Sequence, residues 1–431
     1  FNELGAYEMN AEWPRRAIRD FFVREHGQFA FQPRHDVQLP KVDVVDLYIH
    51  IPFCESLCPH CPYNRTLYDA ELAARYVQAL RNEIEHYYRL LGDIEIGSIY
   101  FGGGTPTTLL GELGSIIEHI RRRFRHAGLI AIETIPNHLD PATLSKLRSS
   151  GVNLLSIGVQ SFDDRYLKLI GRGYRAEILP AAISAALAAG FDSVNLDLMF
   201  ALPGQTTDEA LADLDRALEL GAEQVTLYPL FTFPYSAVGD HLHLQHVNFP
   251  GLVTRRRIYR ALHDEAIARG LNRVSVWGFR KDDIPIFSSV TRDNYVGIGA
   301  GAATCLPSIF YFNTFSIHEY IRGYPGFDLP VALQMTLTPA VERFFWLYWR
   351  LYETFIPKDQ FGRLFAHDRR VRWLLFLALH LHLLNEENSR YVLTERGSFW
   401  IHLLQNVYVL NYINTVWNRC MREAWPGRID L

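Results

Sequence analysis

Three of the five cysteines in this 431-residue chain stand within eight positions, in the segment HIPFCESLCPHCPYN. They are Cys54, Cys58 and Cys61, separated first by three residues and then by two. Thiolates grouped in this way bind zinc or an iron–sulfur cluster. No fourth cysteine is near, because Cys305 and Cys420 are remote in the sequence. Three thiolates in one loop favour a cubane cluster that leaves one iron open to the amine and carboxylate of a small molecule.

A structural zinc ion is the alternative, because His50 or His60 could supply the ligand that a four-coordinate site lacks. This alternative predicts a zinc-stabilised hydrolase or binding protein. Such a protein is colourless when it is purified without air, whereas an iron–sulfur protein is brown.

The segments that must position these cysteines alternate between short apolar runs and helical patterns. Such alternation predicts an α/β fold with parallel strands and helices packed outside them, as an open sheet or as a barrel. The strands are expected at 45–51, 98–103, 129–134, 153–160, 192–200 and 223–230. The helices are expected at 69–91, 111–125, 141–151, up to about 189, at 208–220 and near 252–269.

Polar residues and glycines recur where these strands end. Turn residues are common at any one strand end. Six in succession indicate a site, because in a barrel the chemistry collects at the carboxyl ends of the strands. The six positions are Cys54, the GGGTPT segment at 102–107, Glu133, Gln160, Asp197 and Phe231.

The overall composition excludes several classes of protein. The formal net charge is −4, so neither nucleic acid nor a membrane surface is expected as a partner. Five cysteines do not make a disulfide framework in a chain of this length, and no apolar run approaches the roughly 20 residues of a membrane helix. The polar N-terminus is not a signal peptide and lacks an initiator Met, so we expect a cytoplasmic protein with residues missing upstream of Phe1.

At these motifs the sequence resembles a known family. Cys-x-x-x-Cys-x-x-Cys after a first strand is the hallmark of radical S-adenosylmethionine (SAM) enzymes. The segments YIHIPFC, FGGGTPT, GVQSFD, LDLMFALPGQT and VGIGAGA look like the oxygen-independent coproporphyrinogen oxidase (HemN-like) branch of that superfamily. The resemblance runs from Tyr48 to Thr314 and returns in YVLTERG at 391–397.

The resemblance implies a fold and its division. A partial TIM-type (β/α)6 barrel with its extension is expected over residues 45–332, after an N-terminal extension at 1–44. Residues 333–431 are expected to form a mostly helical, winged-helix-like domain that covers the barrel mouth. Within it we predict a small hairpin, with its turn near Glu386 to Ser389, followed by a helix. Cys305 and Cys420 are expected to be free thiols.

The resemblance also implies cofactors. The three clustered cysteines would hold a [4Fe–4S] cluster, SAM would chelate the fourth iron, and a second SAM would lie beside the first. One electron, from a donor such as a flavodoxin or ferredoxin, would cleave SAM to methionine and a 5′-deoxyadenosyl radical that abstracts hydrogen. The protein must position these cofactors and exclude side reactions.

Site residues follow from the motifs position by position. Tyr48 is expected to pack on the nucleoside, His60 to lie beside the cluster, and Glu133 to bind a polar group of SAM as a buried carboxylate. Glycine lets backbone approach a ligand closely. The resemblance assigns Tyr48, His60, Gly103, Gly104, Thr105 and Glu133 to the first SAM, Gln160, Arg172 and Asp197 to the second, and Phe231 and Ala303 to further ligand walls.

Simpler interpretations remain open for part of this set. Arg172 and Asp197 could form an ordinary ion pair. Phe231 and Ala303 could be core residues. The sequence assigns no catalytic residue.

Two positions depart from the family's pattern. The oxidase carries a fourth cysteine two residues after the third ligand, where this chain has Tyr63, and the family's GRGH reads GRGY here, with Tyr174. These changes argue against decarboxylation of coproporphyrinogen. We therefore predict a HemN-like (class C) radical SAM methyltransferase or cyclopropanase that transfers a SAM-derived methyl or methylene group to an sp² carbon of a planar natural-product substrate.

The substrate prediction depends on aromatic residues. The segment LYPLFTFPY at 227–235 could stack on a planar ring, although core packing is the alternative. A methyltransferase-like partner protein is a further expectation. The alternative functions are a coproporphyrinogen III dehydrogenase or haem-processing oxidoreductase of the same branch, and a non-catalytic haem carrier.

Overall fold

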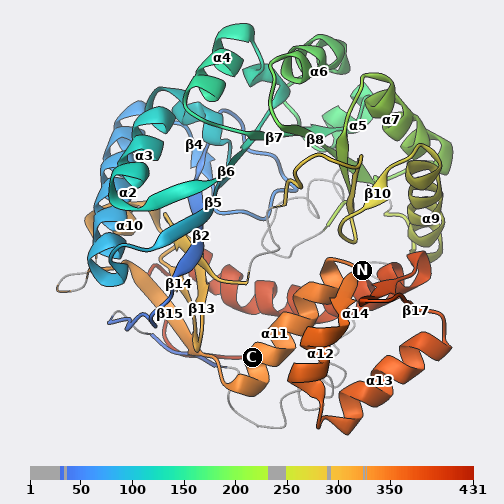
Figure 1. The fold of residues 1–431 in the computed structure, drawn as a ribbon. Helices are drawn as coiled ribbons and strands as arrows, with labels where there is room; N and C mark the ends of the chain where they lie inside the picture. Colours follow the sequence, from blue (N-terminus) through green and yellow to red (C-terminus); the bar gives the residue numbers. More distant parts are fainter. Residues whose placement is uncertain (1–29, 34–35, 232–248, 289–292, 324–325, 327) are drawn as a thin grey trace.

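The computed structural model describes residues 30–33, 36–231, 249–288, 293–323, 326 and 328–431 (Figure 1). A twelve-stranded sheet runs through the molecule in the order β10-β11-β9-β8-β7-β6-β5-β2-β12-β13-β14-β15. Its two outermost strands, β10 and β15, do not pair with each other, so the sheet is an open, partial barrel. This confirms the predicted α/β class.

The centre of the sheet consists of the six predicted strands, all parallel to their neighbours. They are β2 (Val44–Ile51), β5 (Glu95–Gly103), β6 (Arg125–Thr134), β7 (Leu154–Gln160), β8 (Ser193–Phe200) and β9 (Gln224–Pro229). β12 (Tyr295–Ile298) adds a seventh parallel strand beside β2 that the sequence did not reveal. One boundary was wrong, because β6 begins at Arg125, the predicted last residue of the preceding helix, and not at residue 129.

Antiparallel strands extend the sheet at both sides. β13 (Ala303–Leu306), β14 (Ile309–Asn313) and β15 (Val331–Thr336) follow β12, and β11 (Gly278–Arg280) and β10 (Asn272–Arg273) follow β9.

Helices cover the outer face of the parallel strands (Figure 1). Four of them begin at side-chain caps, at Asp69, Asp140, Asp163 and Thr206, and Thr206 forms a full capping box with Glu209. The helices are α2 (Ala70–Leu91), α3 (Leu110–Arg123), α4 (Pro141–Ser149), α5 (Asp164–Leu169), α6 (Leu179–Ala188), α7 (Thr207–Glu219) and α9 (Leu252–Ala268).

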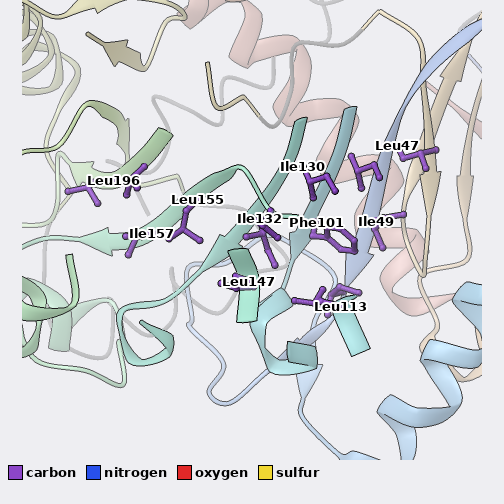
Figure 2. Close-up of a cluster of buried hydrophobic side chains, with 14 of the residues drawn as sticks. Leu47, Ile49, Phe101, Leu113, Ile130, Ile132, Leu147, Leu155, Ile157 and Leu196 are labelled. Atoms are coloured by element: carbon purple, nitrogen blue, oxygen red, sulfur yellow. The ribbon is translucent and has the colours of Figure 1, made fainter. Parts of the chain in front are cut away.

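The strands alternate between an apolar and a polar face. Figure 2 shows the buried apolar cluster between sheet and helices, to which Ile49, Phe101, Ile132, Leu155 and Leu196 contribute. Because successive side chains of a strand point to opposite faces, the neighbours of these residues face the inside of the curved sheet. Those neighbours are His50, Tyr100, Glu133, Ser156 and Asp197. The fold therefore gathers polar groups on its inner face.

The C-terminal part is mostly helical, and Figure 1 shows it on the opposite side from α4 and α6. The predicted hairpin is present as β17 (Leu384–Glu386) and β18 (Arg390–Leu393), with β16 (Phe355–Pro357) as a third strand. The helices are α10 (Ile317–Arg322), α11 (Pro339–Tyr352), α12 (Lys358–Phe365), α13 (Arg369–His380), α14 (Glu395–Tyr412), a π-helix (Ile413–Trp417) and α15 (Asn418–Arg422).

The domain boundary predicted at residue 333 falls inside β15, and the division into domains stays a prediction. The last and the first strand lie side by side in the described part of the chain, because β19 (Ile429–Asp430) pairs with β1 (Ala30–Phe31). No helix among the described residues is long and apolar enough to cross a bilayer.

Candidate cofactor site

The cysteine loop begins at the carboxyl end of β2 and is closed by a short parallel pair of strands. β3 (Phe53–Cys54) and β4 (Thr66–Leu67) pair across the loop, and Tyr68 N–H donates to Cys54 O at 2.8 Å. Arg65 holds the loop from within, donating to Cys58 O at 2.6 Å and to Tyr63 O at 3.2 Å. The loop is thus shaped by its own backbone bonds.

The three thiols lie close to hydrogen-bond donors at the inner face of the sheet. Cys54 and Cys58 are buried and Cys61 is half-buried. Thr105 Oγ1 donates to Cys54 Sγ at 3.7 Å, and Arg172 Nη1 donates to Cys58 Sγ at the same distance. Burial raises the pKa of the Cys54 thiol to about 11, so water does not stabilise a free thiolate there. A bound cationic centre would supply that stabilisation.

The donor set fits a cluster better than a single ion. Among the described residues, no three Cys, His, Asp or Glu side chains converge closely enough to hold one metal ion. A cubane cluster takes each thiolate on a separate iron, so its ligands need not converge. A side chain at Gly104 would place its Cβ 2.9 Å from Cys54 Sγ and 2.7 Å from Phe53 O, so only glycine lets β5 end against this loop.

Both histidines of the zinc alternative have other partners. His50 Nδ1 is 2.9 Å from the Tyr48 hydroxyl and His50 Nε2 is 2.8 Å from Asn64 O, which leaves His50 no nitrogen for a metal. His60 Nδ1 is 3.1 Å from Ile170 O. Burial, and then the charge of Arg172, lower the pKa of His60 to about 3, so its ring is neutral.

The residues assigned to the first SAM come together at the ends of β2, β5 and β6. The Tyr48 and Tyr100 rings lie 6.0 Å apart, and the Tyr100 hydroxyl donates to Glu133 Oε1. Burial, with a smaller contribution from Asp197, raises the pKa of Glu133 to about 7, and the hydrogen bonds from Tyr100 and from the Gly103 N–H oppose this shift. Gly103 has a φ of 113°, a conformation that favours glycine.

The residues assigned to the second SAM stand on the neighbouring strands. Asp197 is half-buried and accepts from Asn195 Nδ2 at 2.9 Å and Ser156 Oγ at 3.1 Å. Burial raises its pKa to about 6. Gln160 Oε1 accepts from the Tyr228 hydroxyl at 2.5 Å.

Arg172 has no carboxylate of its own in the described part of the chain. It forms no ion pair with Asp197 there, and its Nε is buried without a hydrogen-bond partner. The two side chains are therefore not in direct ion-pair contact, although the charge of Arg172 opposes the rise in the pKa of Asp197. An unpaired guanidinium and a separate carboxylate can receive the two charged ends of a zwitterionic amino acid.

Tyr174 and Asp213 hold the end of β7 in an unusual conformation. Gln160 has a φ of 68°, in the left-handed region that non-glycine residues rarely adopt. Before it, the Tyr174 hydroxyl donates to Gly158 O at 2.5 Å and Val159 O at 3.0 Å. After it, Asp213 on α7 accepts from Ser161 Oγ and Phe162 N, each at 2.7 Å.

Sequence reasoning missed the role of Asp213, and also that of Glu83 on α2. Glu83 is buried and accepts from Gly299 N at 2.9 Å, Asn313 Nδ2 at 2.7 Å and the Tyr320 hydroxyl at 2.5 Å. It thereby fixes the VGIGAGA turn. The available signal was an acidic residue at a position of each helix that the apolar pattern assigns to the core.

The two residues predicted to form ligand walls, Phe231 and Ala303, are less clearly part of the site. Ala303 packs against the aromatic cluster of Phe310 and Phe312. In the preceding turn, Ala300 contacts the cysteine segment, because its carbonyl accepts from Asn64 Nδ2 at 3.1 Å. Phe231 is half-buried against the main core. Residues 232–235 of the aromatic segment lie outside the described residues. The roles of Phe231 and Ala303 as ligand walls stay predictions.

Tyr63, the substituted fourth-cysteine position, faces this site. Burial, and then the charges of Glu133, Cys61, Tyr352 and Asp197, raise its pKa above the usual range. About 42% of the residue nevertheless remains exposed.

Comparison with known proteins identifies relatives of this chain. A family model described as the radical SAM superfamily matches residues 48–217. The chain is 30% identical over 293 residues to the heme chaperone HemW of Bacillus subtilis (strain 168), covering 65% of this chain and 77% of that protein. It is 34% identical over 188 residues to the oxygen-independent coproporphyrinogen III oxidase of Salmonella typhimurium, covering 43% of this chain and 41% of the oxidase.

A solved structure shares most of the fold. It is the radical SAM enzyme coproporphyrinogen III oxidase (HemN) from Escherichia coli, with a TM-score of 0.72 and 22% sequence identity. The superposition covers 88% of this chain and 91% of that one.

Proposed function

This chain belongs to the HemN-like branch of the radical SAM superfamily, and from that premise we propose that it is an oxidoreductase that processes a haem-type tetrapyrrole. The two groups of curated relatives described above are named for haem and for coproporphyrinogen, which are both tetrapyrroles. Their names favour the haem-related alternative over the methyl transfer that the sequence first suggested.

The family's cofactors are a [4Fe–4S] cluster and SAM. When bound, they supply the one-electron chemistry that cleaves SAM and removes a hydrogen atom from the substrate. In this chain Cys54, Cys58 and Cys61 would ligate the cluster. The buried positions of two of these thiols, and the glycine that makes room beside Cys54, support this assignment.

The inner face of the sheet would hold SAM. Glu133 would receive a polar group of SAM, and the N–H of Gly103 would keep that carboxylate oriented. Tyr48 presents a ring beside the same carboxylate. Because the side chains come from strands and not from flexible loops, their geometry is set before the ligand arrives.

The single observation that carries the tetrapyrrole assignment is the combination of HemN-like motifs with tyrosines that line the inner face. Tyr48, Tyr63, Tyr100 and Tyr228 all lie within electrostatic reach of Glu133 or Asp197. Tyrosine rings provide broad apolar surface for a flat macrocycle and hydroxyls for its polar substituents.

A second candidate function is methyl or methylene transfer to the same class of substrate. It is supported by the unpaired charges of Arg172 and Asp197, which suit a second SAM beside the first. It is also supported by Tyr63, which stands where the oxidase has its fourth cysteine. A flavodoxin or ferredoxin remains our proposed electron donor for either function.

The deciding experiment uses anaerobically reconstituted protein, dithionite and methyl-labelled SAM, with haem or coproporphyrinogen III added. We expect 5′-deoxyadenosine to form faster with a tetrapyrrole than without it, and the Cys58→Ala variant to form none. S-adenosylhomocysteine together with label in the macrocycle would establish the second candidate instead. Tetrapyrrole binding without any 5′-deoxyadenosine would overturn both and leave a haem carrier.

A further inference from the structure

A π-helical turn in the C-terminal part of the chain contacts the cysteine loop. The turn spans Ile413–Trp417, between α14 and α15. The Trp417 ring lies 6.5 Å from the ring of Tyr63 and 5.8 Å from that of Phe315. Since π turns are rare and occur frequently at functional sites, this contact two residues beyond Cys61 points to a role in ligand binding.

The same turn carries polar atoms that the protein leaves unsatisfied. Trp417 Nε1, Asn414 Oδ1 and Asn418 Oδ1 are buried and have no hydrogen-bond partner in the described part of the chain. Asn414 stands three residues before Trp417 and Asn418 directly after it, so both asparagines are close to Trp417 along the chain. Each buried polar group without a partner costs about 1–3 kcal/mol, and native proteins contain few of them.

The three groups can serve one kind of ligand atom. The indole nitrogen only donates, and an asparagine amide donates or accepts according to its rotation. Arg65, which bonds Tyr63 O, adds a positive charge nearby and has a buried Nε that also lacks a described partner. Donors beside a guanidinium suit a carboxylate, and charge-assisted bonds of this kind are the stronger ones.

We propose that this turn is the substrate-facing wall of the site. A flat conjugated ring packs against Tyr63 and Trp417, and a carboxylate on that ring accepts from Trp417 Nε1 and from the amide of Asn414 or Asn418. This inference rests on the proposed function and deepens it, because a tetrapyrrole with propionate arms has both the ring and the carboxylates. Trp417 is then a residue that determines substrate specificity, contributed by the C-terminal part of the chain.

The test measures binding of haemin to the cluster-loaded protein by absorbance titration. Trp417→Phe keeps an aromatic ring and removes the N–H, and we expect about tenfold weaker binding, because a hydrogen bond to a charged group contributes about 1.5–3 kcal/mol. Trp417→Ala should weaken binding further, because the ring contact is lost as well. Trp400→Phe, on the exposed surface of α14, is the matched control and should bind haemin as the wild type does.

The second probe is haemin dimethyl ester, whose propionates cannot carry charge. The wild type should bind it about tenfold more weakly than haemin, and Trp417→Phe should cause little further loss. If Trp417→Ala, with normal iron content and circular dichroism, binds haemin as the wild type does, the inference is wrong while the proposed function stands. If the wild type binds neither haemin nor coproporphyrin III, the proposed function fails and this inference fails with it. Equal wild-type affinity for haemin and its ester would overturn the carboxylate contact.

Discussion

Tyr174 shows how a departure from a family pattern can acquire a structural role. Its hydroxyl is shared between the carbonyls of Gly158 and Val159, directly before the left-handed Gln160. A backbone in this region costs about 1–3 kcal/mol and persists only when its surroundings hold it there. Tyr174 therefore acts as a positioning residue for the Gln160 amide.

We expect Tyr174→Phe to lower the free energy of unfolding by about 1–2 kcal/mol, because the Gly158 and Val159 carbonyls lose the hydroxyl that they share. SAM binding, measured by equilibrium dialysis, should fall from two sites toward one, since Gln160 belongs to the proposed second site. Tyr68→Phe, at an exposed tyrosine, is the control and should change neither quantity. Loss of stability with unaltered SAM stoichiometry would show that Tyr174 only supports the fold.

Single residues also mark the limit of sequence reasoning. The cysteines were predicted from their spacing, and Glu133 and Asp197 from their places at or near strand ends together with the family resemblance. The left-handed φ of Gln160 and the partners of Asp213 were not predictable, because both depend on contacts between segments that are distant in sequence.

At the scale of elements, buried carboxylates on the helices hold the turns of the site in place. Glu83 lies on α2 and bonds the Gly299 turn, β14 and α10 at once. Burial raises the pKa of Glu83 to about 7. The folded protein therefore holds this proton more tightly than the unfolded chain does.

The stability that this group contributes is complete below its ordinary pKa and is lost as the pH rises through about 7. Between pH 5 and pH 8 the wild type should lose about 3 kcal/mol more than Glu83→Gln does, because glutamine does not titrate. Denaturant unfolding at both pH values measures the difference. Parallel pH profiles for the two proteins would contradict the prediction.

The central strands were predictable as elements, with boundaries within about four residues. Each is a run of apolar residues bounded by turn residues, and this pattern is local in the sequence. β12 was missed because it is four residues long and ends in a glycine-rich turn. Its pairing with β2, almost 250 residues earlier, depends on tertiary contacts that periodicity does not record.

In the whole molecule, a half-buried ion pair connects the C-terminal part to the helix layer of the sheet. Arg256 on α9 and Glu395 in the first turn of α14 are 22% and 16% exposed, and Arg256 Nη2 donates to Glu395 Oε2 at 2.7 Å. Arg273 donates to the carbonyls of Leu393 and Thr394 beside it. These contacts set how α14, and with it the turn that bears Trp417, lies against the parallel strands.

Removing one partner of this pair should be costly, because the other charge stays half-buried without its partner. We expect Arg256→Met to lower the free energy of unfolding by about 3 kcal/mol and to weaken haemin binding. Arg260→Met, which removes an exposed arginine of the same helix, should cost less than about 1 kcal/mol. Chemical denaturation of the two variants provides the comparison, and equal losses would refute the special role of Arg256.

The pairing of β1 with β19 has a consequence for biosynthesis. Ala30 lies opposite Asp430, so the ribosome synthesises the two strands about 400 residues apart. At translation rates of about 5–20 residues per second, the first strand waits roughly 20–80 s for its partner. During that interval Phe31, which ends fully buried, has to be shielded in some other way on the ribosome.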